Sequence, residues 1–219
     1  MTSIPDLVTQ SLTSLPPQLW GDGHQGGDDA SRLAAFKALT TTPKYMMGFY
    51  EPDWTPPDSS KITSTSAASA WSSLIAPLGT KGTLLGSPSL ATQKDESWLT
   101  PFEHASEHPT WDYTCIHTNK PNVTGVKEDV EYYWGKYKKP IWVSEFACVD
   151  DQTWTPCTDA NEIKMFIQEV VAFLQGHESV VAYGYSNGNG LGTAWPMIDS
   201  STGAITASGQ VYLDTISAL

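Results

Sequence analysis

Short apolar runs alternate along the chain with longer segments in which apolar residues recur at helical spacing. The runs have the length and the β-branched and aromatic content of strands, and the segments between them are long enough for helices. The clearest helix lies behind Asp159, an N-cap residue that precedes a single apolar stripe. The predicted strands cover residues 18–20, 45–50, 83–87, 113–117, 141–145 and 180–185, and the predicted helices cover 29–39, 66–78, 96–106, 125–137, 159–175 and 208–219.

This strict alternation predicts an α/β protein whose parallel strands are joined by crossover helices. Two architectures satisfy it, an open doubly wound sheet and a closed barrel, and both place an active site at the carboxyl ends of the strands. With 219 residues and 40% hydrophobic content, and without a break in composition, the chain predicts a single domain over residues 1–219. The sequence has neither a GxGxxG nor a P-loop spacing, so nucleotide binding is not indicated.

Two glutamates stand at predicted strand ends. Glu51 follows the run MMGFY and is followed at once by Pro52, which stops the strand ladder, while Glu145 ends the run PIWVSE. Either residue alone would be read as a solvated loop charge or half of a structural ion pair. The two are about three βα units apart, a spacing that brings them to facing sides of one mouth on a closed barrel but leaves them apart on an open sheet.

A pair of carboxylates across a pocket suits the hydrolysis of a glycosidic bond. One is held protonated to donate to the leaving oxygen, and the other stays ionised to meet the positive charge that develops at the sugar carbon. A separation of about 5 Å between the carboxyl groups predicts a covalent intermediate and retention, whereas about 6.5 to 9.5 Å predicts inversion. We expect the shorter separation.

The other polar and aromatic residues at strand ends are candidate substrate contacts. Core packing is an alternative for Trp20, a backbone-bonded buried imidazole is an alternative for His117, and turn chemistry is an alternative for Asn187. The histidines elsewhere (His24, His104, His108 and His177) show no metal-ligand spacing, so we expect neither a metal nor a cofactor. The predicted substrate contacts are Trp20, Tyr50, Trp54, His117, Asn119, Tyr185 and Asn187.

The net charge of the chain argues against two classes of partner, nucleic acids and anionic membranes. The chain carries 12 Lys+Arg against 24 Asp+Glu, a formal charge of -12, which repels phosphate backbones and anionic membrane surfaces. Nucleic acid and membrane insertion are therefore not expected. Nine Trp and nine Tyr in a chain with only 16% charged residues supply flat faces with polar edges, on which sugar rings pack, although many of them will fill the core.

The cysteines point to an oxidising compartment. Cys148 and Cys157 flank the loop CVDDQTWTPC, so we expect a short-range disulfide there and a buried free thiol at Cys115. The sequon that begins at Asn122 agrees with secretion. From the cysteines and the sequon we expect a secreted or cell-wall protein, and a monomer. The start MTSIPDLVTQ lacks the basic and apolar regions of a signal peptide, so we expect that the signal is absent from this chain.

Five segments resemble one known family. The segments MMGFYEPD, LLGSPSLA followed by WLTPF, DYTCIH, KKPIWVSEFAC and GQVYLDTISAL resemble fungal endo-β-1,3-glucanases of glycoside hydrolase family 128, in order, over most of the chain from about Leu15. The resemblance implies a (β/α)8 barrel of TIM type, a retaining mechanism and β-1,3-glucan as substrate. It also implies that Glu51 is the acid/base and Glu145 the nucleophile.

The chain departs from the family pattern at three places. The family reads Gly-Phe-Asn-Glu-Pro where this chain has Tyr50 in place of the Asn that bonds the sugar 2-hydroxyl, and it reads His-Trp-Tyr where this chain has His117, Thr118 and Asn119. The first two βα units of the barrel have no counterpart, because only residues 18–20 form a strand before Glu51. A glucan-binding module with weak or lost catalysis is therefore the alternative function.

Overall fold

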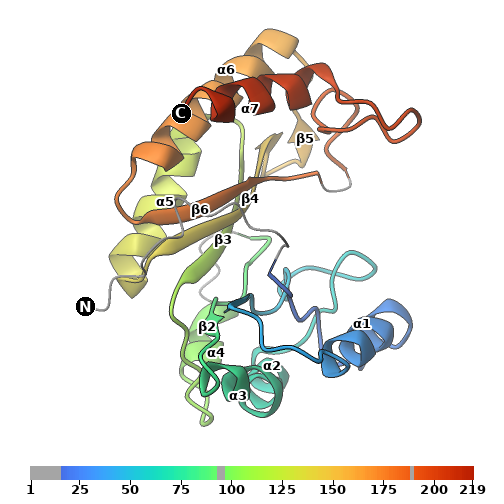
Figure 1. Cartoon of the computed structure of the whole chain (residues 1–219), viewed down its shortest axis with the longest axis vertical. Helices are drawn as coiled ribbons and strands as arrows, with labels where there is room; N and C mark the ends of the chain where they lie inside the picture. Colours follow the sequence, from blue (N-terminus) through green and yellow to red (C-terminus); the bar gives the residue numbers. More distant parts are fainter. Residues whose placement is uncertain (1–15, 93–96, 188–189) are drawn as a thin grey trace. The chain divides into compact units, whose positions relative to one another are not determined.

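The computed structural model describes residues 16–92, 97–187 and 190–219, and these residues form an α/β structure (Figure 1). Residue 96, with which the predicted helix 96–106 begins, lies outside the described residues. The helices are α1 (Gly27–Lys37), α2 (Ser64–Ala70), α3 (Ala76–Gly79), α4 (Leu99–Glu103), α5 (Val123–Tyr137), α6 (Ala160–Gly176) and α7 (Ala207–Ser217). The strands are β1 (Tyr45–Met46), β2 (Leu84–Leu85), β3 (Thr114–Lys120), β4 (Ile141–Asp150), β5 (Thr155–Pro156) and β6 (Val180–Tyr185).

The strands form two sheets within the described residues. β1 and β2 pair in parallel, as the alternation predicts, and the second sheet has the order β3-β4-β5 with β6 beside β4. β5 runs antiparallel to β4, because the two form the hairpin around the cysteine loop. Single parallel bridges (Gln18 with Met47, Tyr50 with Ser89, Gly86 with Tyr113) continue the ladder beyond β1 and β2. The α/β class is thus confirmed, and closure into a barrel stays a prediction.

Contacts divide the chain into two compact units. The first contains Met1–Ile116 and Tyr137–Trp142, and the second contains His117–Lys136 and Val143–Leu219. Each unit has its own buried aromatic cluster, and each holds one of the two glutamates. Glu51 follows the Tyr50 bridge, as predicted, but Glu145 lies inside β4, so the prediction that the strand ends at residue 145 is wrong. The strand continues to Asp150 because β5 pairs with its last residues. The described part of the chain has no helix long and apolar enough to cross a membrane.

The first unit is packed around Phe102 on α4. The Phe102 ring stacks on Trp98 with centroids 5.5 Å apart and meets Trp71 edge-on at 5.5 Å. The indole N–H of Trp98 donates to the carbonyl of Ile62 at 2.9 Å, so the buried polar atom is satisfied. The predicted helix 66–78 is interrupted here by a π-helical turn, Trp71–Ile75. Pro77 lies just beyond this turn and has no N–H to donate, so regular α-helical bonding cannot continue through it.

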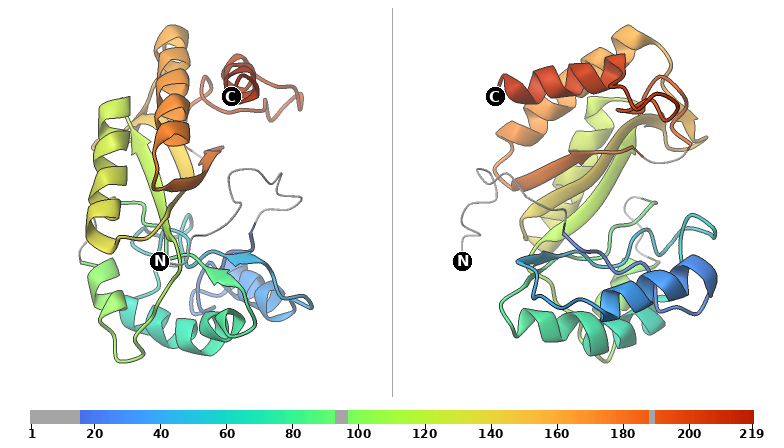
Figure 2. Two further views of the ribbon diagram at one scale, coloured as in Figure 1. Left: turned by 60° about the vertical axis from the view of Figure 1, so that its left-hand side comes forward. Right: turned by 45° about the vertical axis from the view of Figure 1, so that its right-hand side comes forward.

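The second unit is built on α6. Asp159 caps this helix, because its carboxylate accepts the N–H groups of Asn161 and Glu162 at 2.9 Å each. α7 lies beside α6 in all views (Figures 1 and 2). The predicted apolar stripe is confirmed as the buried face of α6: Ile163, Phe166, Ile167, Val170, Val171 and Leu174.

The expected disulfide is present. Cys148 and Cys157 are bonded, with Cα atoms 5.5 Å apart, and Cys115 is a buried free cysteine. The N–H of Cys157 also donates to the carbonyl of Cys148 at 3.0 Å, so covalent and backbone bonds close the same hairpin. Burial raises the pKa of the Cys115 thiol well above its usual range, which keeps this cysteine protonated and unreactive.

Replacing both Cys148 and Cys157 by Ser should lower the free energy of unfolding by about 2 to 3 kcal/mol, the entropy of closing so short a loop. The melting temperature should fall by roughly 5 to 10 °C in a chain of this size. Dithiothreitol is the matched control, because it should lower the melting temperature of the wild type and leave the double variant unchanged. A wild type that is insensitive to reductant would contradict the prediction.

Candidate functional site

In the first unit, Glu51 sits where the strand ladder stops. Its N–H donates to the carbonyl of Ser89 at 2.8 Å, next to the Tyr50–Ser89 bridge. The backbone of Glu51 then turns into the left-handed region, with φ 42°, which is rare for a residue with a side chain and costs strain. The carbonyl of Glu51 accepts the hydroxyl of Ser59 at 2.6 Å and the N–H of Trp54 at 2.9 Å. These bonds hold the strained turn and thereby fix where the Glu51 side chain leaves the backbone.

The loop that follows Glu51 is tied down at several points. The carboxylate of Asp53 accepts the N–H groups of Ala91 and Thr92 at 2.9 and 2.7 Å. Trp54 lies in the same loop and is 43% exposed, so part of its side chain can be reached by a ligand. This is the placement expected of a sugar platform, and the substrate contact itself stays a prediction.

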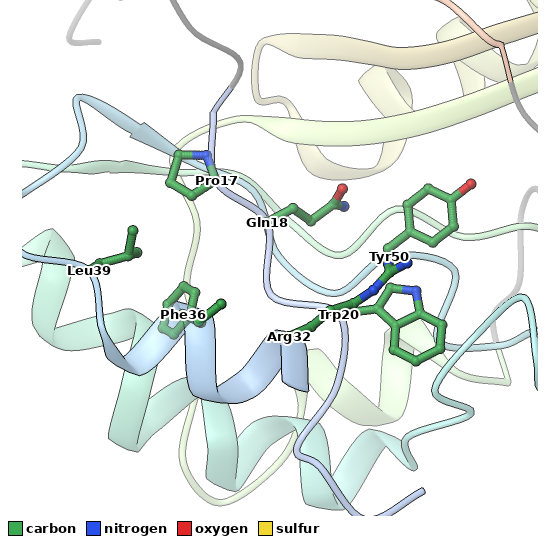
Figure 3. Close-up of a pocket in the computed structure, with 8 residues that line it drawn as sticks. Pro17, Gln18, Trp20, Arg32, Phe36, Leu39 and Tyr50 are labelled. Atoms are coloured by element: carbon green, nitrogen blue, oxygen red, sulfur yellow. The ribbon is translucent and has the colours of Figure 1, made fainter. Parts of the chain in front are cut away.

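Trp20 and Tyr50 line one cavity of about 540 Å³ in the first unit (Figure 3). Its volume lies in the range of about 300 to 1,000 Å³ typical of small-ligand sites. Trp20 is buried, and the guanidinium of Arg32 lies 4.6 Å from the centre of its ring, a cation–π contact that fixes both side chains. The full lining is Pro17, Gln18, Trp20, Arg32, Ala35, Phe36, Leu39 and Tyr50.

In the second unit, three neighbouring strands bring polar groups to Glu145. The hydroxyl of Ser186, directly after β6, donates to Oε2 of Glu145 at 2.7 Å. On β3, Nε2 of the buried His117 lies 3.9 Å from Oε1 of Glu145. The Glu145 side chain remains 22% exposed, so it is held on one side and open to solvent on the other. His117 therefore lies beside the predicted nucleophile, as a residue that orients it would.

Asn119 lies two residues beyond His117 on β3, and side chains two apart on a strand share a face. Asn119 is only 3% exposed, and its Oδ1 has no hydrogen-bond partner among the described residues. A buried amide oxygen of this kind costs free energy until a donor reaches it. Oδ1 of Asn119 can accept a hydrogen bond from a hydroxyl group of a ligand.

The contacts of Tyr185 and Asn187 are structural ones. The Tyr185 ring stacks on Trp195 with centroids 4.3 Å apart, and its hydroxyl donates to the Trp195 carbonyl. Burial raises the pKa of Tyr185 well above its usual range. The side-chain oxygen of Asn187 accepts the N–H of Met197 at 2.8 Å. Substrate binding by these two residues stays a prediction.

Two serines that bond the glutamates were missed by the sequence analysis: Ser59 donates to the backbone carbonyl of Glu51, and Ser186 donates to the carboxylate of Glu145. Ser59 is eight residues after Glu51, and Ser186 is 41 residues after Glu145, so neither follows from local spacing. Ser186 does directly follow a predicted strand, and that position was the available signal. Glu51 belongs to the first unit and Glu145 to the second, and the expected separation of about 5 Å between their carboxyl groups stays a prediction.

A metal-ligating cluster occurs next to neither glutamate in the described part of the chain. The described groups of three ligand-type residues are Cys148, Cys157 and Glu162, whose cysteines are consumed by the disulfide, and Asp22, His24 and Asp29 in the first unit. The carboxylate of Glu145 has the His117 imidazole and the Ser186 hydroxyl as neighbours.

Comparison with known proteins places these residues in a family. The family described as "Glycosyl hydrolase catalytic core" matches residues 3–212. Alkali-sensitive linkage protein 1 of Schizosaccharomyces pombe is 29% identical over 193 residues, which are 84% of this chain. The match covers 35% of that protein, so the chain spans about a third of the length of this relative.

Solved structures give the finer assignment. A GH128 (subgroup VII) oligosaccharide-binding protein from Trichoderma gamsii is 48% identical with a TM-score of 0.88, over 93% of this chain and 80% of that one. A GH128 (subgroup II) endo-β-1,3-glucanase from Sorangium cellulosum is 22% identical with a TM-score of 0.69, over 90% and 79%, and shows the shared fold alone. The match over residues 3–212 and these likenesses lead to one conclusion: the chain belongs to glycoside hydrolase family 128.

Proposed function

We propose that this protein binds β-1,3-glucan oligosaccharides and retains the glycosidase fold with weak or lost catalysis. The observation that carries the proposal is the Tyr50 side chain, which stands directly before Glu51 and lines the 540 Å³ cavity with Trp20. The 48% identity to a family member named as an oligosaccharide-binding protein supports it. The β-1,3 linkage is taken from the named activity of the more distant glucanase.

Tyr50 changes binding and catalysis in different ways. In the family pattern an Asn at this position bonds the sugar 2-hydroxyl, a contact that strengthens in the transition state. The Tyr phenol reaches several ångströms farther from its backbone, so it cannot repeat that contact in the same place. Its ring instead adds a flat face beside Trp20 for packing against a sugar. Tyr50 therefore keeps or strengthens the binding of the oligosaccharide in its ground state. It removes a contact that would bind the transition state more tightly than the ground state.

We further propose that the fold is a (β/α)8 barrel of TIM type that lacks its first two βα units. The parallel bridges of the first unit follow chain order, from Gln18 to Met47 and from Gly86 to Tyr113, as barrel strands do. Within the second sheet, β4 lies between β3 and β6, so its strands also neighbour one another in chain order. A single such domain would span residues 1–219.

Retaining endo-hydrolysis is the second candidate, because both glutamates are present. In this mechanism Glu51 gives its proton to the glycosidic oxygen while Glu145 attacks the anomeric carbon, and the bond to the leaving sugar breaks. Glu51 then takes a proton from water, whose oxygen displaces Glu145. The Ser186 bond to Oε2 would leave Oε1 of Glu145 for the attack. Both candidates predict oligosaccharide binding, and only turnover separates them.

A secreted or cell-wall location fits either candidate. The Cys148–Cys157 disulfide is a bond that persists in oxidising compartments. Asn122, the sequon residue, is exposed in the loop before α5, where a glycan could be attached. We propose a secreted monomeric glycoprotein of fungal type.

The pure protein should bind laminarioligosaccharides saturably and release no shorter products above a no-enzyme control. Glu145→Gln should change the dissociation constant of the oligosaccharide by less than about threefold. Binding of the ground state does not depend on the charge of the carboxylate that would attack the sugar. Glu128→Gln, an exposed acid on α5, is the matched control. Calorimetry measures binding, and chromatography by size measures products. Turnover that Glu145→Gln abolishes would replace the proposal with the second candidate, and absence of binding would reject both.

Tyr50→Asn should raise kcat by up to about tenfold, about 1.4 kcal/mol in the barrier, because it restores the short amide of the family pattern. The same change should weaken oligosaccharide affinity, because it removes a ring from the cavity wall. Tyr50→Phe is the control, since it keeps the ring and removes only the hydroxyl. If Tyr50→Asn lowers kcat relative to wild type, Tyr50 itself assists turnover and the argument from the lost contact is wrong.

A further inference from the structure

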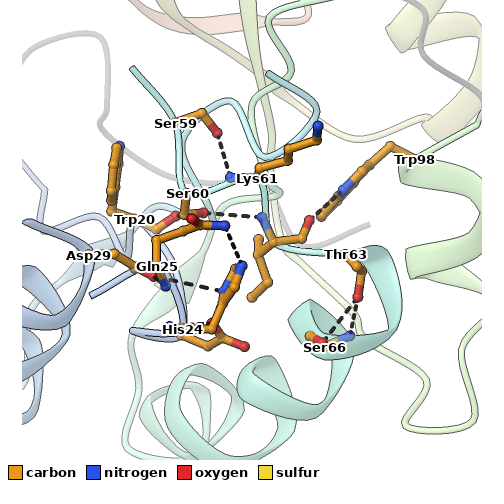
Figure 4. A network of polar contacts seen from close by, with 12 residues as sticks. Trp20, His24, Gln25, Asp29, Ser59, Ser60, Lys61, Thr63, Ser66 and Trp98 are labelled. Carbon is orange, nitrogen blue, oxygen red and sulfur yellow. Dashed lines mark hydrogen bonds and ion pairs between the residues drawn. The ribbon is translucent and has the colours of Figure 1, made fainter. Parts of the chain in front are cut away.

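Three ligand-type side chains converge at the start of α1. Asp22, His24 and Asp29 each offer an atom within 4.8 Å of the others. Nδ1 of His24 lies 2.5 Å from Oδ1 of Asp22 and 3.8 Å from Oδ2 of Asp29. In Figure 4 the Asp29 carboxylate points toward the His24 ring, and a dashed line joins them. Gly23, with φ 85°, lets the chain reverse between Asp22 and His24.

Asp29 is a buried carboxylate with few partners. Its residue is 1% exposed and its side chain 0%. Oδ2 accepts one backbone N–H, that of Gln25, at 3.2 Å, and Oδ1 has no hydrogen-bond partner among the described residues. The only basic side chain that the described residues place within 4 Å of Asp29 is the His24 ring. A buried carboxylate without such compensation is costly.

The cluster holds more negative than positive charge. Asp22 and Asp29 bring two carboxylates to one imidazole, which supplies at most one positive charge, so a divalent cation would neutralise the site better than a proton does. The His24 side chain is 44% exposed and that of Asp22 27%, so an ion can enter from solvent. The Asp29 carboxylate is already in place before an ion binds. Its Oδ1 fills the space beside Gly21, where a Cβ would lie 2.4 Å from this oxygen, so the absence of a side chain at residue 21 makes room for it.

We propose that Asp22, His24 and Asp29 form a binding site for one divalent cation of the zinc class. One imidazole nitrogen and two carboxylates are a donor set for Zn²⁺, with water in the fourth position, whereas Ca²⁺ and Mg²⁺ prefer oxygen ligands alone. Zn²⁺ holds such ligands at about 2.0 to 2.2 Å, so neighbouring donors lie roughly 3.5 Å apart. The Nδ1–Oδ2 distance of 3.8 Å already fits, and the Nδ1–Oδ1 contact of 2.5 Å must open by about 1 Å as the ion displaces the shared proton to solvent.

Gln25 lies where a supporting residue is needed. Its side-chain amide is 2.9 Å from Nε2 of His24. In the structure the amide nitrogen of Gln25 faces Nε2 of His24. When Nδ1 binds an ion, Nε2 carries the hydrogen and needs an acceptor, so the Gln25 amide must turn over to present its oxygen. The loop also continues directly from Trp20, and the carbonyl of Trp20 accepts the Ser60 hydroxyl at 2.9 Å. A bound ion would therefore fix the Trp20 wall of the cavity relative to α1, which carries Arg32 and Phe36.

The test is thermal unfolding of the pure full chain in EDTA and in excess ZnCl₂, with bound zinc counted by elemental analysis. At a zinc concentration near 100 times the dissociation constant the melting temperature should rise by about 5 to 10 °C, with one ion per chain. His24→Ala and Asp22→Asn alter partly exposed side chains and should each weaken zinc binding by at least about tenfold. Asp28→Asn removes a charge from the same helical turn outside the cluster and should leave the shift intact.

Three results would overturn the proposal. The wild type could show no shift with zinc, the shift could persist in His24→Ala, or Ca²⁺ could produce the same shift as Zn²⁺. Asp29→Asn is informative in a further way: it should abolish zinc binding without costing stability in EDTA, because Asn keeps the shape of the side chain and an oxygen that can accept the Gln25 N–H. If Asp29→Asn fails to fold, the two exposed variants decide the outcome. Since zinc is the probe, the result does not depend on whether the chain binds or cleaves glucan.

Discussion

The pleat of β4 is the constraint on which the second unit depends. Neighbouring side chains on a strand point to opposite faces, so Phe146 and Glu145 cannot lie on the same side. Phe146 is fully buried among the rings of Phe166, Trp195 and Tyr212. Anchoring Phe146 in this cluster turns Glu145 to the other face, where β3 and the end of β6 supply His117 and Ser186. The packing of Phe146 in the apolar core therefore sets the direction of the neighbouring Glu145 side chain.

Glu51 is positioned by a backbone turn and not by the pleat of a strand. Its strand is only two residues long as a regular element, and the ladder beyond it consists of single bridges. The direction of the side chain is set instead by the left-handed backbone and by the carbonyl that Ser59 and Trp54 hold. A turn of this kind is strained, and strained residues that their surroundings hold in place are typical of functional sites. The two glutamates therefore differ in position and in supporting structure, because Glu51 lies in a turn and Glu145 lies inside β4.

The distinction between binding and catalysis rests on what surrounds these carboxylates. An intact pair of glutamates does not by itself give turnover, because catalysis needs contacts that strengthen in the transition state. Tyr50 replaces the family Asn at one such contact and adds to the wall of an aromatic cavity. Asn119 offers a buried acceptor beside His117. Under the proposed function, both features would serve to hold a ligand in its ground state.

Much of the fold could be predicted from the sequence, because its signals are local. The stripe of α6 and its Asp159 cap and the short cysteine loop all follow from spacing along the chain. The end of the strand at Glu145 was predicted wrongly, because β4 continues to Asp150 where it pairs with β5. The predicted helix 66–78 misses its π turn, because local bonding around Pro77 overrides the period of the apolar residues.

The sequence by itself determined the α/β class, the disulfide and the identity of the candidate carboxylates, since these depend on periodicity and on neighbouring residues. Only the tertiary structure decided that Ser186 bonds Glu145, that Tyr185 packs on Trp195, and that Asp22, His24 and Asp29 meet. The first two depend on which residues of distant segments face each other. The third depends on glycine turns whose positive φ angles reverse the chain, so that an irregular spacing in sequence becomes a compact cluster in space.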